Sequence, residues 1–164
     1  MDIVIIFVNI NSLLTHKLLF ESLLLEEKAQ AFILNETRFT TSTHCKITGY
    51  KFIHQTSTIP ALRANGGVAI GHKPSIPHRP HHIRHMQLPE YLISTIYFKN
   101  LYVTLVTIYV RPGHPIPHQF FQYISDNFQT YVIMADINIH SRSDRQRARF
   151  NTYITNHFEL KKRM

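Results

Sequence analysis

The sequence predicts one domain of mixed α/β (α+β) structure that extends over residues 1–164. Three observations predict this fold class. The chain begins with an apolar segment, a helix-forming segment and a second apolar segment, which is the order of a βαβ unit. Two β-rich segments near the middle are separated by a short polar turn, the pattern of a hairpin. Apolar residues make up 44% of the chain and charged residues 17%, which excludes wholesale disorder and allows a full core.

The N-terminal segments supply the predicted βαβ unit. Residues 1–8 are rich in Ile and Val, which is typical of a buried strand. Residues 16–30 are good helix formers without Gly or Pro, and Ser12 or Thr15 is placed to cap this helix. Because its apolar residues lie nearly all round, we expect the helix to be well buried. Residues 31–34 then form a second short strand.

The middle of the chain predicts four more strands. Residues 50–54 and 68–72 are β-rich, and Asn65-Gly66-Gly67 between them is a turn signal. Residues 92–98 and 102–110 form the hairpin. The intervening residues 73–89 hold four prolines without periodicity, so we expect a surface loop there.

The C-terminal third predicts a helix, a strand and a second helix. Pro117 suits the first turn of a helix, and an apolar stripe at helical spacing follows it: Phe120, Phe121, Ile124 and Phe128. Residues 131–135 form an apolar strand. A second helical stripe consists of Phe150, Tyr153, Ile154 and His157.

The charge of the chain favours an anionic partner. Lys and Arg total 18 and Asp and Glu total 10, giving a net charge of +8, and nucleic acid is the simplest partner of such a chain. One cysteine excludes a disulfide framework. The apolar segments are too short for a secretory signal or a membrane span. We therefore expect an intracellular protein that is not secreted and has no membrane partner.

Polar side chains stand where the predicted strands end. They are Asn9, Glu36, Tyr109, Asp136 and Asn138. A carboxylate at such a position is a natural ligand for Mg²⁺, and a second one can deprotonate a water molecule. Strand-end Asn, Asp and Glu are also common turn formers, so spacing alone leaves both interpretations open.

Five segments in this order resemble the endonuclease/exonuclease/phosphatase superfamily. They are Asn9-Ile10-Asn11-Ser12, Leu34-Asn35-Glu36-Thr37, Gly66-Gly67-Val68-Ala69-Ile70, Leu105-Val106-Thr107-Ile108-Tyr109 and Ile133-Met134-Ala135-Asp136-Ile137-Asn138-Ile139-His140. Together with Pro89-Glu90-Tyr91-Leu92, they are most similar to the apurinic-endonuclease-like domain of non-LTR (LINE-type, jockey-like) retrotransposons. The resemblance implies a two-sheet β-sandwich flanked by helices, a four-layer fold with its site at one rim.

The resemblance also implies a reaction and a role for each strand-end residue. Glu36 would be the principal Mg²⁺ ligand with Asn9 beside it, and Tyr109 would contact the scissile phosphate. Asp136 would polarise the attacking water, and Asn138 would position water or phosphate. The reaction would be magnesium-dependent hydrolysis of a phosphodiester in DNA, which nicks the target for retrotransposition. A protein that acts on genomic DNA would be nuclear.

The sequence departs from the superfamily pattern at several positions. Val8, Asn35 and Ala135 replace the usual aromatic residue, Gln and Gly. An Ala before Asp136 would crowd the strand end if the backbone there needed a positive φ. No residue of the chain matches the closing Ser-Asp-His motif, so we expect a C-terminally truncated copy whose last strands are missing. Such a copy would expose an apolar edge and self-associate.

Basic residues outside the motifs are candidates for nucleic-acid contact. They are Arg79, Arg84, Arg111, Arg142 and Arg145. The histidines around Arg79 and Arg84 (His72, His78, His81, His82 and His85) favour a solvated basic loop over a transition-metal site, because their spacing is irregular.

Three functions remain open from the sequence. The first is a magnesium-dependent DNA endonuclease. The second is a catalytically impaired remnant that acts at most as a basic nucleic-acid-binding module. The third keeps the fold but acts on a phosphate monoester or a phospholipid.

Overall fold

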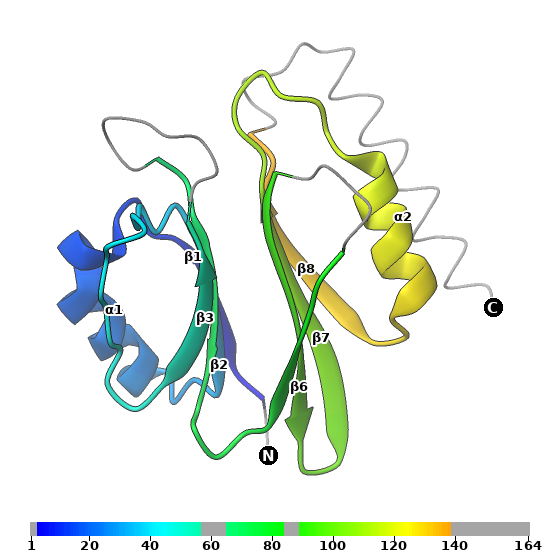
Figure 1. The fold of residues 1–164 in the computed structure, drawn as a ribbon. Coiled ribbons are helices and arrows are strands. Elements are labelled where there is room, and N and C mark those ends of the chain that lie inside the picture. The colour runs from blue at the N-terminus through cyan, green and yellow to red at the C-terminus, as the bar shows by residue number, and fades with distance from the viewer. Residues whose placement is uncertain (1–2, 57–64, 84–88, 139–164) are drawn as a thin grey trace.

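The computed structural model describes residues 3–56, 65–83 and 89–138, which form two four-stranded sheets flanked by two helices (Figure 1). Sheet A has the order β1-β2-β4-β3, with β1 (Ile5–Asn9), β2 (Ala31–Asn35), β3 (Lys51–Gln55) and β4 (Val68–His72). Sheet B has the order β5-β6-β7-β8, with β5 (His78–His81), β6 (Glu90–Phe98), β7 (Leu101–Tyr109) and β8 (Tyr131–Asp136). The helices are α1 (Leu13–Glu26) and α2 (His118–Asn127).

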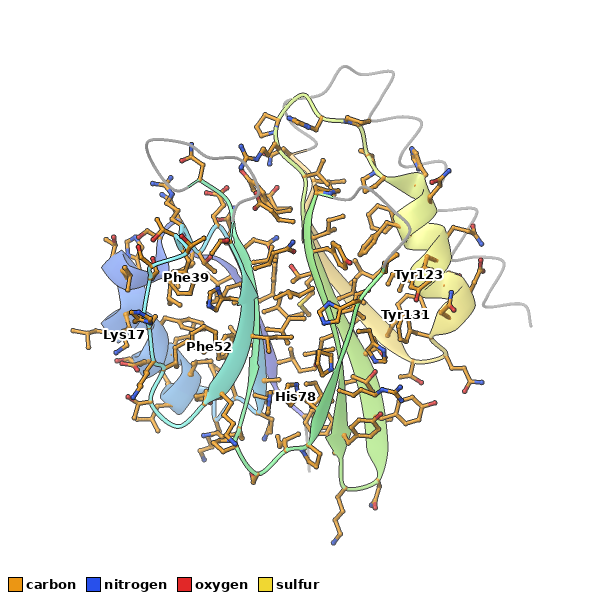
Figure 2. The ribbon with its side chains drawn as sticks, viewed as in Figure 1. Lys17, Phe39, Phe52, His78, Tyr123 and Tyr131 are labelled. Atoms are coloured by element: carbon orange, nitrogen blue, oxygen red, sulfur yellow. The ribbon has the colours of Figure 1, made fainter. Side chains whose placement is uncertain are left out.

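Three apolar clusters separate four layers of structure. Phe20 of α1 packs on Phe32 of sheet A, and Phe120 of α2 packs on sheet B. Between the sheets lies a third cluster that includes Ile33 and Leu105. Figure 2 shows Phe39 and Phe52 between sheet A and α1, and Tyr123 and Tyr131 between sheet B and α2. The predicted fold class, two packed sheets with helices outside, is confirmed.

Most of the predicted elements in the described residues are confirmed. Strands β1 and β2 are parallel with α1 between them in the chain, as the βαβ pattern predicts. Strands β6 and β7 form the expected antiparallel hairpin. Helix α2 follows Pro117 and buries Phe120, Phe121 and Ile124 of the predicted stripe, whereas Phe128 follows the helix and is partly buried. Neither α1 nor α2 is long and apolar enough to cross a membrane.

The predicted burial of the first strand and helix is wrong. Strand β1 is an edge strand of sheet A, and Phe7 on it is 38% exposed. Helix α1 ends at Glu26, short of residue 30, and buries Leu13, Phe20 and Leu24. Four of its leucines are exposed: Leu14, Leu18, Leu19 and Leu25. Only one face of α1 meets sheet A, so an all-round apolar pattern does not produce all-round burial.

Ser12 precedes α1 as predicted, but its side chain makes no hydrogen bond to the helix backbone. Its hydroxyl instead lies 2.9 Å from that of Thr15. The predicted loop at residues 73–89 contains strand β5, which pairs antiparallel with β6. Strand β5 tolerates Pro80, which has no backbone N–H, because an edge strand forms backbone hydrogen bonds with a neighbouring strand on one side only. The helical stripe expected at residues 150–157 lies outside the described residues.

Candidate active site

Strand periodicity brings the strand-end polar residues into the space between the sheets. Along β2, Phe32 and Leu34 face α1, whereas Ala31 and Ile33 belong to the cluster between the sheets. Successive side chains point to opposite faces of a strand, so Asn35 continues the inner series. The same alternation leads along β7 to Tyr109 and along β8 to Asp136.

Strand register then aligns these inner residues at one end of the two sheets. Asn9 lies opposite Asn35 in sheet A. Tyr109 lies between Glu90 and Asp136 in sheet B. The five side chains therefore form two facing rows where β1, β2, β7 and β8 end and β6 begins.

The amide of Asn9 joins carboxylates that come from different sheets. Its Nδ2 donates to Glu36 Oε1 at 3.1 Å and to Asp136 Oδ2 at 2.9 Å. Glu36 directly follows β2 and Asp136 ends β8, 100 positions later in the chain. Two carboxylates thus lie within the span of two hydrogen bonds around one neutral donor.

Asp136 is held from three sides. Besides the bond from Asn9, its Oδ1 accepts from the backbone N–H of Asn138 at 3.0 Å. Its own backbone N–H donates to the side-chain oxygen of Asn35 at 2.8 Å, in the amide orientation that satisfies both ends of Asn35. In that orientation Asn35 Nδ2 donates to Thr107 Oγ1 at 2.6 Å and to the Leu34 carbonyl at 3.1 Å. Asn35, which is fully buried, therefore ties sheet A to the strand that carries Asp136.

The segment after β2 has an uncommon backbone. Glu36 (φ 56°) and Arg38 (φ 55°) lie in the left-handed region, as does Asn138 (φ 48°) after β8. Neighbouring segments hold it in place: Ser12 N–H donates to the Glu36 carbonyl at 2.8 Å, and Arg38 N–H donates to the Gly66 carbonyl at 2.8 Å. Strained residues of this kind persist where the surrounding structure fixes them, and they cluster at functional sites.

Tyr109 keeps its proton at neutral pH. Burial, followed by the nearby charges of Glu36 and Asp136, raises the pKa of its phenol above the ordinary value, while a hydrogen bond with Asn138 acts in the opposite direction. The hydroxyl is therefore a donor beside two carboxylates. Asn138 also donates from its amide to the Val110 carbonyl at 2.9 Å, which fixes the segment after β8 against the end of β7.

A pocket of about 320 Å³ adjoins these residues. Its lining combines anionic, cationic and neutral polar groups with a proline and a glycine: Glu36, Arg38, Asn65, Gly66, Tyr109, Arg111, Pro112 and His114. The carboxylate of Glu36 therefore shares a pocket with two arginines and a histidine.

The donor set around Asn9 fits a hard divalent cation. The carboxylates of Glu36 and Asp136 offer oxygen ligands, which Mg²⁺ prefers, and Asn9 lies beside both. Among the described residues neither carboxylate forms a salt bridge with Lys or Arg. That part of the chain holds no group of three or more His, Cys, Asp or Glu side chains placed to bind a metal. Mg²⁺ is usually bound by one or two carboxylates together with water and substrate phosphate, so two carboxylates suffice.

The structure brings together five of the residues selected from the sequence: Asn9, Glu36, Tyr109, Asp136 and Asn138. Ala135 is not among the positive-φ residues and lies within β8, so it does not crowd the strand end. Of the basic candidates, Arg111 lines the pocket. Arg84, Arg142 and Arg145 lie outside the described residues.

Arg79 does not join the site. It lies on β5 opposite Thr95, five residues along β6 from Glu90, or roughly 16 Å at the rise of a strand. The neighbouring His78 and His81 do not form a solvated loop, because their rings contact the hydroxyls of Ser94 (3.3 Å) and Thr95 (2.8 Å) on β6.

Sequence reasoning missed the supporting residues of the site. In the sequence, Asn35 and Glu90 stand within motif segments, and Asn35 departs from the superfamily pattern, but neither is predicted as a site residue. Arg38 and His114 carried no signal beyond their closeness in the chain to Glu36 and Tyr109. The alternation along β2 was the one available clue, since it places Asn35 in the inner series.

A scan against protein-family models and a search of the curated proteins found no match. Solved structures do match. The endonuclease domain of TRAS1, a telomere-specific non-LTR retrotransposon, aligns with a TM-score of 0.62 and 16% identity over 93% of this chain and 69% of that one. An AP endonuclease from Archaeoglobus fulgidus aligns at 0.58 and 16% identity over 84% and 58%.

A 3′ phosphatase from Neisseria, bound to a product DNA hairpin, aligns at 0.62 and 14% identity over 95% of this chain and 70% of its own. The chain thus spans 58% to 70% of the length of these three proteins. At such identities the comparison bears on the fold. The chain has the endonuclease/exonuclease/phosphatase fold that its sequence motifs predicted.

Proposed function

We propose that the chain hydrolyses phosphodiester bonds in DNA with the help of Mg²⁺. The observation that carries the proposal is the meeting of Glu36 and Asp136, from different sheets, at the amide of Asn9. Structures with this fold include two named as endonucleases and one named as a 3′ phosphatase bound to DNA. The net charge of +8 favours a polyanionic substrate.

Glu36, with Asn9 beside it, would hold the cation. When bound, Mg²⁺ supplies positive charge that stabilises the charge developing on the phosphate. Both carboxylates would otherwise repel the anionic substrate.

The residues of the chain account for the remaining requirements. Asp136 can accept a proton from the attacking water, and three contacts fix its orientation: Asn9 Nδ2, the Asn138 N–H and the Asn35 amide. Tyr109 remains protonated and can donate to a phosphate oxygen. Asn138 positions the segment that ends the site, through its bond to Val110.

The finer proposal is target nicking for a non-LTR retrotransposon, on nuclear DNA. The retrotransposon motifs of the sequence and the similarity to the TRAS1 domain support it. A target-site preference measured on natural insertion sites would test this level separately from the chemistry.

The test of the chemistry is a supercoiled-plasmid assay in Mg²⁺ that compares the chain with Glu36→Ala. We expect slow nicking that disappears in the variant and in EDTA. It should be slow because neither Glu36 nor Asp136 forms a hydrogen bond with a histidine of the described residues, and a positioned acid or base contributes about 10²- to 10⁴-fold. DNA binding without any Glu36-dependent nicking would reject hydrolysis and favour the nucleic-acid-binding module instead.

A further inference from the structure

Arg111 lines the pocket beside the carboxylates and forms an ion pair with Glu90 that the proposed chemistry does not use. Arg111 Nη2 lies 3.1 Å from Glu90 Oε1. The Glu90 side chain is only 2% exposed, whereas that of Arg111 is 21% exposed. The pair therefore presents its guanidinium, and not its carboxylate, to the pocket surface.

Glu90 also contacts the turn that carries Gly66, another lining residue of the pocket. Its Oε2 accepts from the backbone N–H of Gly67 at 2.6 Å. A Cβ on Gly66 would collide with the same carboxylate, so the Gly66-Gly67 turn fits closely around it. The carbonyls of Gly67 and Gly66 accept hydrogen bonds from the backbone N–H groups of Thr37 and Arg38, respectively.

One buried carboxylate therefore joins three parts of the site: the segment after β2, the glycine turn, and the segment after β7 that carries Arg111. A buried carboxylate is costly unless it is paired, and here both of its oxygens have a partner. Such an arrangement holds a guanidinium at a defined place beside Tyr109, which lies next to Glu90 in sheet B.

The remaining lining of the pocket suits an anion. The exposed Arg38 can contribute positive charge, and the exposed Asn65 and His114 can contribute hydrogen-bond donors. A guanidinium has five N–H donors, more than one carboxylate oxygen can accept, so Arg111 can bind Glu90 and a phosphate at the same time.

We propose that Arg111, positioned by Glu90, binds a second phosphate of a polynucleotide, adjacent to the phosphate that reacts at Glu36 and Asp136. Arg111 is the binding residue and Glu90 a positioning residue. The site then takes a nucleic-acid strand in preference to a phosphate monoester. The proposal depends on the proposed function only for the location of the reacting phosphate.

The test measures DNA binding in EDTA, so that no cleavage is involved. A fluorescent duplex of roughly 10 base pairs is titrated with the full chain across a salt series, and one- and two-phosphate nucleotides compete for binding. The main variant is Glu90→Gln/Arg111→Gln, which keeps the net charge and leaves no buried carboxylate unpaired. The control is Lys99→Gln, which removes one exposed charge at the far end of sheet B, in the β6–β7 turn.

We expect the double variant to bind the duplex roughly tenfold more weakly, the worth of one charged hydrogen bond, and to reduce the salt slope by about 1. In the competition experiment, the double variant should no longer bind two-phosphate nucleotides more tightly than one-phosphate nucleotides. Lys99→Gln should change the affinity less than about twofold. Wild-type affinity in the double variant, or an equal loss in Lys99→Gln, would overturn the proposal.

The single variant Glu90→Gln separates positioning from charge. This substitution removes one negative charge and so raises the net charge by one. If Glu90 only neutralises the charge of Arg111, the variant should bind DNA more tightly. A positioning role predicts weaker binding, because a Gln side chain has one acceptor oxygen for the two donors of Arg111 and Gly67. Tighter binding would remove Glu90 from the proposal. A chain that fails to nick DNA but shows these binding losses would reject hydrolysis and keep the phosphate subsite.

Discussion

The space between the two sheets has an apolar middle and a polar end, although the same strands line both. Ile33 on β2 and Leu105 on β7 are fully buried in the middle. In the same alternating series, Asn35 is the next inner residue after Ile33, and Thr107 and then Tyr109 follow Leu105. The apolar packing of the sandwich and the polar contacts of the candidate site therefore depend on different positions of one side-chain series.

The two regions also differ in what holds their side chains. The apolar middle is stabilised by area removed from water, about 25 cal/mol per Å², which has no direction. The polar end needs a partner for each buried group, and Asn35 and Glu90 meet that need across the two sheets. Directional bonds fix atoms more narrowly than packing does, and the positive-φ residues Glu36, Arg38 and Asn138 all lie at this end.

Asp136→Asn should have the largest effect, because it changes the chemistry of the polar end without changing its shape. Nicking in Mg²⁺ should fall about 10²- to 10⁴-fold, since an amide cannot accept the proton of the water. Thermal unfolding should change little. The matched control is Asp126→Asn on α2, an exposed carboxylate bound by Gln122, which should nick like the wild type. Equal nicking by the two variants would remove Asp136 from the mechanism.

Leu105→Ala tests the apolar middle. It should lower the free energy of unfolding by about 2–5 kcal/mol, because it removes a fully buried side chain and leaves a cavity between the sheets. Leu101→Ala at the half-exposed start of the same strand should cost less than about 0.5 kcal/mol. Urea unfolding of both variants measures the difference, and similar midpoints would show that the middle is not the stabilising region.

Asn35→Leu replaces a polar residue, located where the apolar middle meets the polar end, with an apolar one. It should cost about 1–3 kcal/mol, because the Asp136 N–H and the Thr107 hydroxyl lose their partner. Nicking should fall as well, since Asp136 loses one of its three supports. A gain in stability would mean that burial at this position outweighs the hydrogen bonds, contrary to the role given to Asn35.

Acid should weaken the sandwich through histidines away from the polar end. Burial, with positively charged neighbours, lowers the pKa of His78 and of His81 below the ordinary value near 6.5. The unfolded chain then binds protons that the folded chain does not, so stability falls as the pH drops below about 6.5. Urea midpoints of the wild type and of His78→Asn between pH 5 and 8 test this. A decline of the same steepness in both would mean that His78 does not contribute.

Leu18→Gln on α1 should have the smallest effect on stability. The side chain is 79% exposed, so the free energy of unfolding should change by less than about 0.5 kcal/mol. If the exposed leucines of α1 promote self-association, the variant should sediment more nearly as a monomer. An unchanged sedimentation profile would leave the edge strand β1 as the surface to test.

The sequence by itself determined most of the elements and selected the polar residues that meet at the candidate site. Alternation and helical spacing located nine of the ten described elements, because local periodicity reflects which face of an element is buried. Five motifs in order pointed to the fold that solved structures share. Asn9, Glu36, Tyr109, Asp136 and Asn138 were selected because each stands where a strand ends.

Tertiary structure alone decided the features that depend on contacts between distant segments. The residues of β5 predict a loop, but they form a strand because they pair with the backbone of β6. Four leucines of α1 are exposed because a single sheet covers one face of the helix. The amide of Asn35 reaches β8, and the carboxylate of Glu90 reaches both Gly67 and Arg111, across separations that no local pattern records. Packing of the two sheets, and not any short segment, sets these partners.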